Sequence, residues 1–476
     1  MSYSDYINKS IDDVDDVARS EINIPEEFSK RNEFFLAPGS RKYSKQYFSM
    51  YQYRLRNLKN RVEAAAMEKW GNGTKQIDGQ MIFKRNKILD ITTGKLCWVV
   101  GTVFCEAKYK LNILNDVEKG TDDVMPLVPV SYTDSEDSQL VMLEDESGRA
   151  ILQNKEYLKK NLLVTGCVVA VLGMEIQAGI FEIMDVAYPT CAPQKLLPSA
   201  TSGKIALVSG LNIGEESHHD LRLELLKQYV IGELGNSDDK SSSSLISQLI
   251  VAGNSIMPIQ NARAEMDLKN YITTNNYGSK NISKYNAESL KQLDGFLKEV
   301  IVSLPVAVMP GDHDPAEICL PQQPLHKMLF RTNKSLLGSD RLTRMTNPQW
   351  MEVNGVRILG TSGQNVDDIK RYIAEDTTVP SSSVEIMESN IKWQNFAPTA
   401  PDTLYCYPYD DYDPFILTDE VPHVYFVGNQ ERFETKKLEY DGRTVRLVSV
   451  PNFHESGEVI LLDLKTLDTE VVKIEL

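Results

Sequence analysis

The chain has 476 residues, the length of two or three average domains. Its apolar fraction of 42% and charged fraction of 25% are typical of a globular protein. The net charge of −16 opposes unaided binding to the phosphate backbone of nucleic acids. No apolar run approaches the ~18 residues of a membrane span, and the polar N-terminus lacks the apolar stretch of a secretion signal, so we expect a soluble intracellular protein.

The cysteines form no C-x-x-C pair, and most of them have apolar neighbours. This pattern favours free thiols in a reducing compartment over disulfides, and it disfavours zinc and iron–sulfur sites. We therefore expect no cofactor.

The first part of the chain changes its pattern twice. Residues 1–40 are acidic and weakly periodic, which predicts a flexible tail or a segment that orders on a partner. Apolar residues recur at helical spacing over 47–70, so we expect residues 41–90 to hold an amphipathic helix packed on the next domain. Residues 91–190 show about five strands and a polar insertion over 115–139, which is typical of a small barrel of the OB type.

Barrels of this type often bind single-stranded nucleic acid through aromatic side chains in a basic groove. The predicted strands and turns carry acidic side chains instead, namely Glu106, Glu144, Asp145, Glu146 and Glu175. We therefore favour a structural or interface role for the barrel over nucleic-acid binding.

A linker rich in Pro, Ser and Gly covers residues 191–203, and strands and helices alternate after it. We expect residues 204–476 to form a layered α/β domain. The expected strands cover 204–211, 249–253, 305–310, 356–360 and 424–428, and the expected helices cover 221–234 and 287–301. Four β segments follow from residue 437 and are expected to form or extend a second sheet. The polar stretches 237–244 and 377–383 are expected to be mobile insertions.

The segment MPGDHD at residues 309–314 directly follows an expected strand. It resembles the Gly-Asn-His-Asp loop of calcineurin-like phosphoesterases, which hold two metal ions at the carboxyl ends of their strands. The other motifs of that family align with altered residues in this chain. Gly210 and Asn212 replace Asp and His, Asn254 replaces Asp, Ser362 replaces His, Asn429 and Glu431 replace two His, and Asp312 replaces the Asn beside His313.

Hard divalent cations need carboxylates and imidazoles, and loss of even a supporting side chain costs roughly 10–100-fold in metal affinity or activity. Asp312, His313 and Glu431 could still touch a cation, but they cannot build a two-metal cage alone. His313 and Asp314 resemble the proton-donating pair of the family, although we favour hydrogen-bonded loop residues. We expect neither metal nor catalysis; the alternative is a residual phosphodiesterase or nuclease using Asp312 and His313.

Two longer strings narrow the resemblance: LPQQPLHK at residues 320–327 and APTAPDTL at residues 397–404. Both are similar to the small (B) subunits of eukaryotic DNA polymerase delta, with a fungal-like character, and the likeness runs from about residue 47 to the C-terminus. It implies a mixed α+β fold, in which an OB-type β-barrel precedes an inactivated calcineurin-like phosphoesterase domain of α/β/β/α layers.

The same resemblance implies a non-catalytic scaffold of DNA replication and repair in the nucleus. Its partners would be the C-terminal module of the catalytic polymerase subunit and a further accessory subunit. In fungal relatives the subunit also serves the catalytic subunit of polymerase zeta in translesion synthesis. Little direct nucleic-acid binding and no membrane contact are implied.

Residues 393–415 place aromatic side chains among prolines. Because prolines restrict the backbone, ordering it on a partner costs less entropy, and aromatic anchors are frequent at interface hot spots. The alternative, which we weigh equally, is that these aromatics cover the core of the sheet. The candidate interface residues are Trp393, Phe396, Tyr405, Tyr407, Tyr409, Tyr412 and Phe415.

Overall fold

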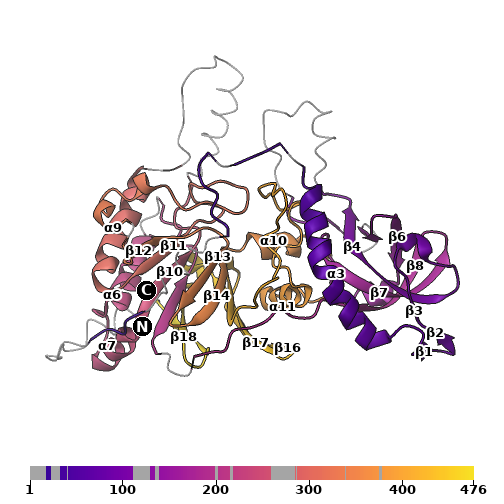
Figure 1. Cartoon of the computed structure of the whole chain (residues 1–476). Helices are drawn as coiled ribbons and strands as arrows, with labels where there is room; N and C mark the ends of the chain where they lie inside the picture. Colours follow the sequence, from indigo (N-terminus) through magenta and orange to yellow (C-terminus); the bar gives the residue numbers. More distant parts are fainter. Residues whose placement is uncertain are drawn as a thin grey trace, which may run out of the picture.

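Three large β-sheets organise the computed structural model of the chain (Figure 1). The structure describes residues 18–22, 33–39, 41–44, 46–110, 129–134, 139–198, 202–214, 218–258, 285, 287–337, 339–374 and 378–475. None of the helices in these ranges is long and apolar enough to cross a lipid bilayer.

The first large sheet closes into a barrel. Its six strands run in the order β3-β4-β5-β6-β8-β7, and β4 also pairs with β7, so the barrel has no open seam between them. The strands are β3 (Phe83–Lys84), β4 (Leu96–Ala107), β5 (Gln139–Glu144), β6 (Arg149–Gln153), β7 (Val168–Gln177) and β8 (Ile180–Ala187). A small hairpin and two short helices accompany them: β1 (Gln76–Ile77), β2 (Gln80–Met81), η1 (Ile88–Asp90) and α5 (Lys155–Leu158). The expected OB-type barrel is confirmed.

Helix α3 (Phe48–Trp70) lies between the barrel and the second lobe of the molecule (Figure 1). It buries Leu58, Val62 and Ala66 against barrel residues that include Trp98. These apolar residues recur three to four positions apart and so share one face of the helix, as their spacing predicted. The helix ends at Gly71, whose φ of 69° is disfavoured for residues with a side chain.

The second lobe stacks two sheets face to face (Figure 1). One sheet contains, in order, β12 (Leu342–Arg344), β11 (Val306–Met309), β10 (Ile246–Ala252), β9 (Lys204–Val208), β18 (Glu458–Asp463) and β19 (Thr469–Lys473). The other contains β13 (Gln349–Val353), β14 (Val356–Thr361), β15 (Val424–Gln430), β17 (Arg443–Pro451) and β16 (Glu434–Tyr440).

Helices cover both outer faces of this pair of sheets. The first sheet carries α6 (His218–Ile231) and α9 (Ala287–Ser303), and the second carries α10 (Gln364–Lys370) and α11 (Ser383–Trp393). Shorter helices lie in the connections: α7 (Ser237–Ser244), η3 (Lys327–Leu329), η4 (Lys334–Leu336) and α12 (Phe453–Ser456). The expected α/β/β/α layers of a phosphoesterase-like domain are therefore confirmed.

Strand β9 shows why the central strands have continuous apolar sequences. Ile205 and Leu207 face the second sheet, whereas Ala206 and Val208 face α6 and α9. Because both faces of a central strand are buried, no polar alternation remains in its sequence.

Two sequence expectations for this lobe were wrong. The four C-terminal β segments divide between the sheets: β16 and β17 extend the second sheet, whereas β18 pairs with β9 in the first and carries β19. The polar stretch 237–244 forms α7, which begins with a capping box between Asn236 and Asp239. Side-chain capping compensates for the weak helix preference of its serines, which hydrophobic periodicity cannot reveal. In the stretch 377–383, residue 377 is outside the described part, and Ser382 caps α11.

Parts of the predicted N-terminal tail pack on the folded body. Arg19 donates hydrogen bonds to the carbonyl oxygens of Val230, Ser243 and Ile246. Phe34 is fully buried, with its ring centroid 6.2 Å from that of Phe396. The expectation of a flexible tail is therefore corrected for residues 18–22 and 33–39, while the rest of 1–32 and most of the insertion over 115–139 lie outside the described residues.

Arg54 of α3 occupies the junction of the barrel and the second lobe and is fully buried. Its Nε donates to Oδ2 of Asp413 at 2.7 Å. Its Nη atoms donate to the carbonyl oxygens of Gly166 in the barrel and of Pro398 and Ala400 in the second lobe, at 3.3, 2.8 and 2.9 Å. A buried ion pair becomes tolerable when the remaining donors are satisfied in this way.

Replacing Arg54 by Met should lower the free energy of unfolding by about 3–5 kcal/mol, because Asp413 keeps a buried charge without its partner. Denaturant titration followed by circular dichroism measures this change. The matched control is Arg56→Met, which removes the same charge from an exposed position on α3 and should change stability by less than about 0.5 kcal/mol. Equal effects of the two substitutions would show that the junction does not depend on the buried pair.

Candidate functional site

The carboxyl ends of the parallel strands in both sheets meet at one edge of the second lobe. We call the residues there the strand-end site; they are Gly210 and Asn212 after β9, Asn254 after β10, His313 after β11, Ser362 after β14 and Asn429 in β15. Strands β9, β10 and β11 are parallel, as are β14, β15 and β17, so the loops that follow them converge.

Backbone hydrogen bonds join the first three loops of the site. The N–H of Gly210 donates to the carbonyl of Gly253 at 2.9 Å, and the N–H of Asn212 donates to the carbonyl of Asn254 at 3.0 Å. Oδ1 of Asn254 accepts the backbone N–H of His313 at 3.0 Å. Asn254 therefore uses its side-chain oxygen to hold the loop that carries the histidine.

Asn429 connects the two sheets. Its Nδ2 donates to the carbonyl oxygens of Ala252 at 3.2 Å and Ser362 at 2.7 Å, and its N–H donates to Oγ of Ser209 at 2.8 Å. The amide thus spans the ends of β9, β10 and β14. A histidine at this position could not donate two hydrogen bonds from one nitrogen in this way.

Asp314 has its carboxyl group committed to the backbone. One oxygen accepts the N–H of Gly311 at 2.8 Å and the other accepts the N–H of Ile256 at 3.1 Å. Burial raises the pKa of Asp314 to about 6, and the backbone hydrogen bonds offset part of that rise. The side chain therefore closes its own loop and is not presented to a proton acceptor outside the protein.

Sequence analysis missed a set of amide side chains around the site. Nδ2 of Asn347 donates to Oε1 of Gln322 at 2.7 Å and to Oγ of Ser362 at 3.0 Å, and Gln364 joins the same group. Asn452 follows β17 and accepts a hydrogen bond from Nδ2 of Asn212 at 3.4 Å. Its place after a buried strand was the available signal; Asn347 and Gln322 lie outside the strand ends and gave none.

Two predicted residues do not join the others in a common site. Asp312 lies in the loop of His313 with an exposed side chain. Glu431 is also exposed, and it lines a separate hollow together with Lys370 and Arg432. In the part of the chain that the structure describes, no three His, Cys, Asp or Glu side chains form a group that could hold a metal. The neutral amides of the strand-end site do not match the donors that two divalent cations need.

The aromatic segment belongs mainly to the interior. Trp393, Phe396 and Phe415 are at most 1% exposed, and Tyr409 is also buried. These four residues cannot contact a partner directly, so their assignment as candidate interface residues is corrected in favour of the core. Tyr405, Tyr407 and Tyr412 are half-buried.

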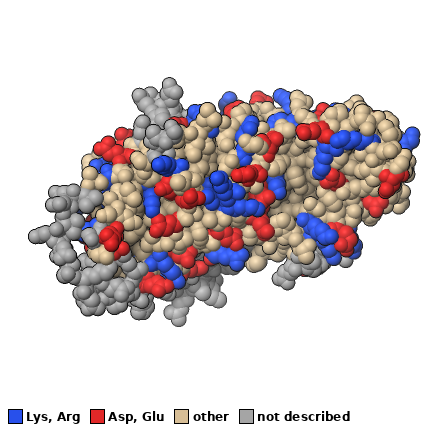
Figure 2. All heavy atoms as spheres, turned by 90° about the horizontal axis from the view of Figure 1, so that it is seen from below, with Lys and Arg blue, Asp and Glu red and all other residues tan. Residues whose placement is uncertain are grey.

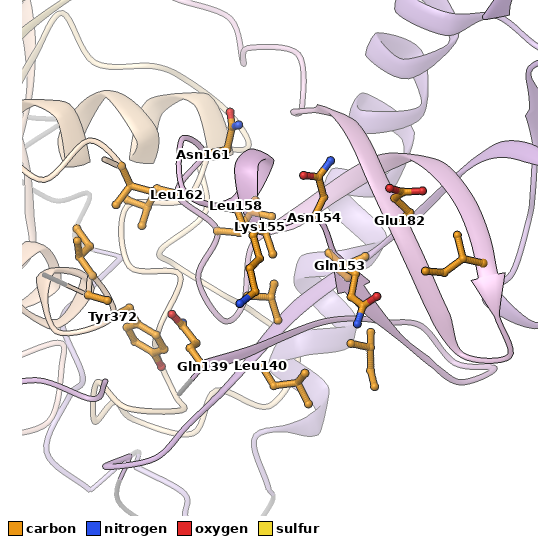
Figure 3. Close-up of a pocket in the computed structure, with 18 residues that line it drawn as sticks. Gln139, Leu140, Gln153, Asn154, Lys155, Leu158, Asn161, Leu162, Glu182 and Tyr372 are labelled. Atoms are coloured by element: carbon orange, nitrogen blue, oxygen red, sulfur yellow. The ribbon is translucent and has the colours of Figure 1, made fainter. Parts of the chain in front are cut away.

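A hollow of about 440 Å³ separates the barrel from the layer of α10 and α11. Figure 3 shows Tyr372 on one side of it and barrel residues such as Leu140, Leu158 and Leu162 on the other. Its polar rim includes Gln139, Gln153, Asn154, Lys155, Asn161 and Glu182. An apolar floor with a polar rim, shared by two domains, is typical of a binding surface.

Comparison with known proteins gives consistent matches over most of the chain. A family described as the OB-fold domain of the DNA polymerase delta small chain matches residues 46–186, and one that describes the B subunits of DNA polymerases alpha and epsilon matches residues 205–435. The chain is 40% identical to the DNA polymerase delta small subunit of Saccharomyces cerevisiae, over 94% of this chain and 93% of that protein. It is 35% identical to the DNA polymerase delta small subunit of Oryza sativa subsp. japonica, over 93% and 96%. Identity to DNA polymerase delta subunit 2 of Drosophila melanogaster is 36%, over 90% and 93%.

The strand-end site has no room for a side chain at Gly311. A Cβ atom there would lie 2.3 Å from both the backbone nitrogen and Oδ1 of Asn254. Gly311→Ala should therefore lower the free energy of unfolding by roughly 1–3 kcal/mol, measured by urea titration. Gly295→Ala in α9 is the control: its Cβ would meet nothing within 4 Å, and alanine should stabilise that helix by roughly 0.5–1 kcal/mol. Destabilisation by both substitutions to the same extent would contradict the predicted clash.

The raised pKa of Asp314 predicts a pH dependence. The usual carboxyl pKa is about 4, so between about pH 4 and pH 6 the folded chain keeps a proton that the unfolded chain releases. The contribution of Asp314 to stability should therefore fall by on the order of 2–3 kcal/mol as pH rises through this window. Unfolding titrations at pH 4.5 and pH 7 should show that Asp314→Asn removes this component. Asp312→Asn, an exposed change in the same loop, should keep it; if Asp314→Asn keeps it as well, the assignment is wrong.

Proposed function

The chain belongs to the family of DNA polymerase delta small subunits, and from this premise we propose that it is a non-catalytic scaffold of that polymerase. The names of its relatives support an accessory role in DNA replication. In this role the chain bridges the C-terminal module of the catalytic subunit and a further accessory subunit. It does so in the nucleus and contributes to DNA repair through the same complex.

The observation that carries this proposal is the chemistry of the strand-end site. Gly210, Asn212, Asn254, Ser362 and Asn429 stand where the resemblance to calcineurin-like phosphoesterases places metal ligands, and none of them carries a charge or an imidazole. In the structure these side chains donate to and accept from one another and the backbone. Groups that hold the fold together in this way are not available to activate water.

The hollow between the barrel and the α10–α11 layer offers the catalytic subunit a docking surface that touches both domains. Leu140 of β5 is 38% exposed and lines this hollow. Apolar side chains surrounded by a polar rim allow water to be excluded from the centre of a contact. The same complex-forming role extends to the catalytic subunit of polymerase zeta in translesion synthesis.

Direct binding of nucleic acid plays little part in this proposal. Figure 2 shows one face of the molecule, on which Lys and Arg alternate with Asp and Glu and do not gather into a basic track. The net charge of −16 also repels a phosphate backbone. The barrel is therefore assigned to protein contacts.

Co-expression of the chain with the C-terminal module of the polymerase catalytic subunit tests the proposal. The wild-type chain should co-purify with that module in a one-to-one complex. Leu140→Asp places a charge in the apolar hollow and should weaken retention by at least tenfold, because an unpaired buried charge opposes association. The matched control is Leu89→Asp, on a barrel residue that is 74% exposed outside the hollow, which should retain the module. Thermal unfolding of both variants confirms that they are folded.

The alternative activity has a distinct signature. A residual phosphodiesterase using Asp312 and His313 would hydrolyse bis(p-nitrophenyl) phosphate with Mn²⁺ or Mg²⁺ and lose that activity in His313→Ala. We expect no hydrolysis above the metal-only background in either protein. Hydrolysis that depends on His313, or failure of the wild-type chain to retain the module, would overturn the scaffold assignment.

A further inference from the structure

Three asparagine side chains surround the space beside Gly210. A Cβ atom at Gly210 would lie 2.6 Å from Oδ1 of Asn452 and 3.0 Å from Oδ1 of Asn429, so both oxygens are directed at that space. Nδ2 of Asn212 lies 3.4 Å from Oδ1 of Asn452 and brings the third amide to its border. We call these three asparagines and Gly210 the asparagine cradle.

Two oxygens of the cradle lack hydrogen-bond donors. Among the described residues, no donor reaches Oδ1 of Asn212 or Oδ1 of Asn429, although both atoms are shielded from solvent. Asn212 as a whole is 3% exposed. Buried acceptors without a donor are rare and are usually satisfied by a bound group. Because both atoms are acceptors, such a group must be electropositive.

We propose that the asparagine cradle binds one monovalent cation, K⁺ or Na⁺. Amide oxygens are hard donors that carry partial negative charge but no net charge, which suits a weakly charged ion. A divalent ion is disfavoured, because the buried carboxylate of Asp314 spends both oxygens on the backbone N–H groups of Ile256 and Gly311. The ion joins the ends of β9, β15 and β17, and so ties the two sheets together at the edge where the loops converge.

This site differs from a two-metal phosphoesterase centre in its donors and in its consequence. It fills the space that a missing side chain leaves at Gly210, and it stabilises the fold without generating a nucleophile. It is also independent of the scaffold role, because neither the hollow at Leu140 nor any partner takes part.

Thermal unfolding at constant ionic strength tests the proposal. The chain, freed of divalent ions with EDTA, is unfolded in 0.2 M KCl, NaCl or choline chloride. An ion that binds only the folded state raises Tm as its concentration rises, so K⁺ or Na⁺ should raise Tm by roughly 2 °C or more over choline. Choline is too large for a space bounded by Gly210. The comparison of KCl with NaCl shows which ion the cradle prefers.

Gly210→Ala should remove this ion dependence, because its methyl group occupies the space of the ion. The control is Gly442→Ala, since Gly442 has a similar φ of 70° but its Cβ would meet nothing within 4 Å. It should lose a similar amount of stability from backbone strain and keep the ion dependence. If Gly210→Ala does not fold, crystals of the wild-type chain soaked in RbCl should show an anomalous peak beside Asn429 and Asn452. Equal Tm values in the three salts, or a site that holds water only, would overturn the proposal.

Discussion

The buried guanidinium of Arg54 is the constraint on which the arrangement of the two domains depends. A charge that is removed from water must find its partners within the protein, and those of Arg54 come from Asp413, from the barrel at Gly166 and from the segment around Pro398. The barrel interior and the α10–α11 layer also share one continuous apolar cluster. Barrel and second lobe therefore pack as one body, with α3 between them (Figure 1).

The strand-end site shows how a fold can keep the geometry of a catalytic centre and use it for cohesion. Parallel strands still deliver their loops to one edge, yet the side chains there are amides, which both donate and accept hydrogen bonds. Asn429 alone connects β15 to the ends of β10 and β14. Such side chains replace repulsion between clustered carboxylates with mutual hydrogen bonding. The close approach of Gly311 to Asn254 records how tightly the loops are drawn together.

Much of the fold could be predicted because hydrophobic spacing reports directly on burial. The helical period of α3, the apolar run of β9 and the strands of the barrel all carried that signal. Hydrogen-bonded features carried none: α7 depends on a capping box, and β18 could have joined either sheet because both are buried on two faces. The strand-end residues were located through their position after strands. Their amide partners Asn347 and Gln322, which are distant in sequence, could not be found in that way. Proline-bound aromatics such as Trp393 and Phe415 look alike in a core and at an interface, so the sequence left both interpretations open.

The contact between Arg54 and Asp413 also has a consequence for the synthesis of the chain. The two residues are 359 positions apart, so the ribosome must produce most of the protein before the guanidinium meets its carboxylate. Until then a nascent chain exposes the face of α3 and the barrel surface that the second lobe will cover. A prematurely terminated chain never acquires Asp413 and displays an unpaired charge beside apolar surface, which is a pattern that chaperones and proteases recognise. The junction therefore acts as a test of completeness, which only full-length subunits pass.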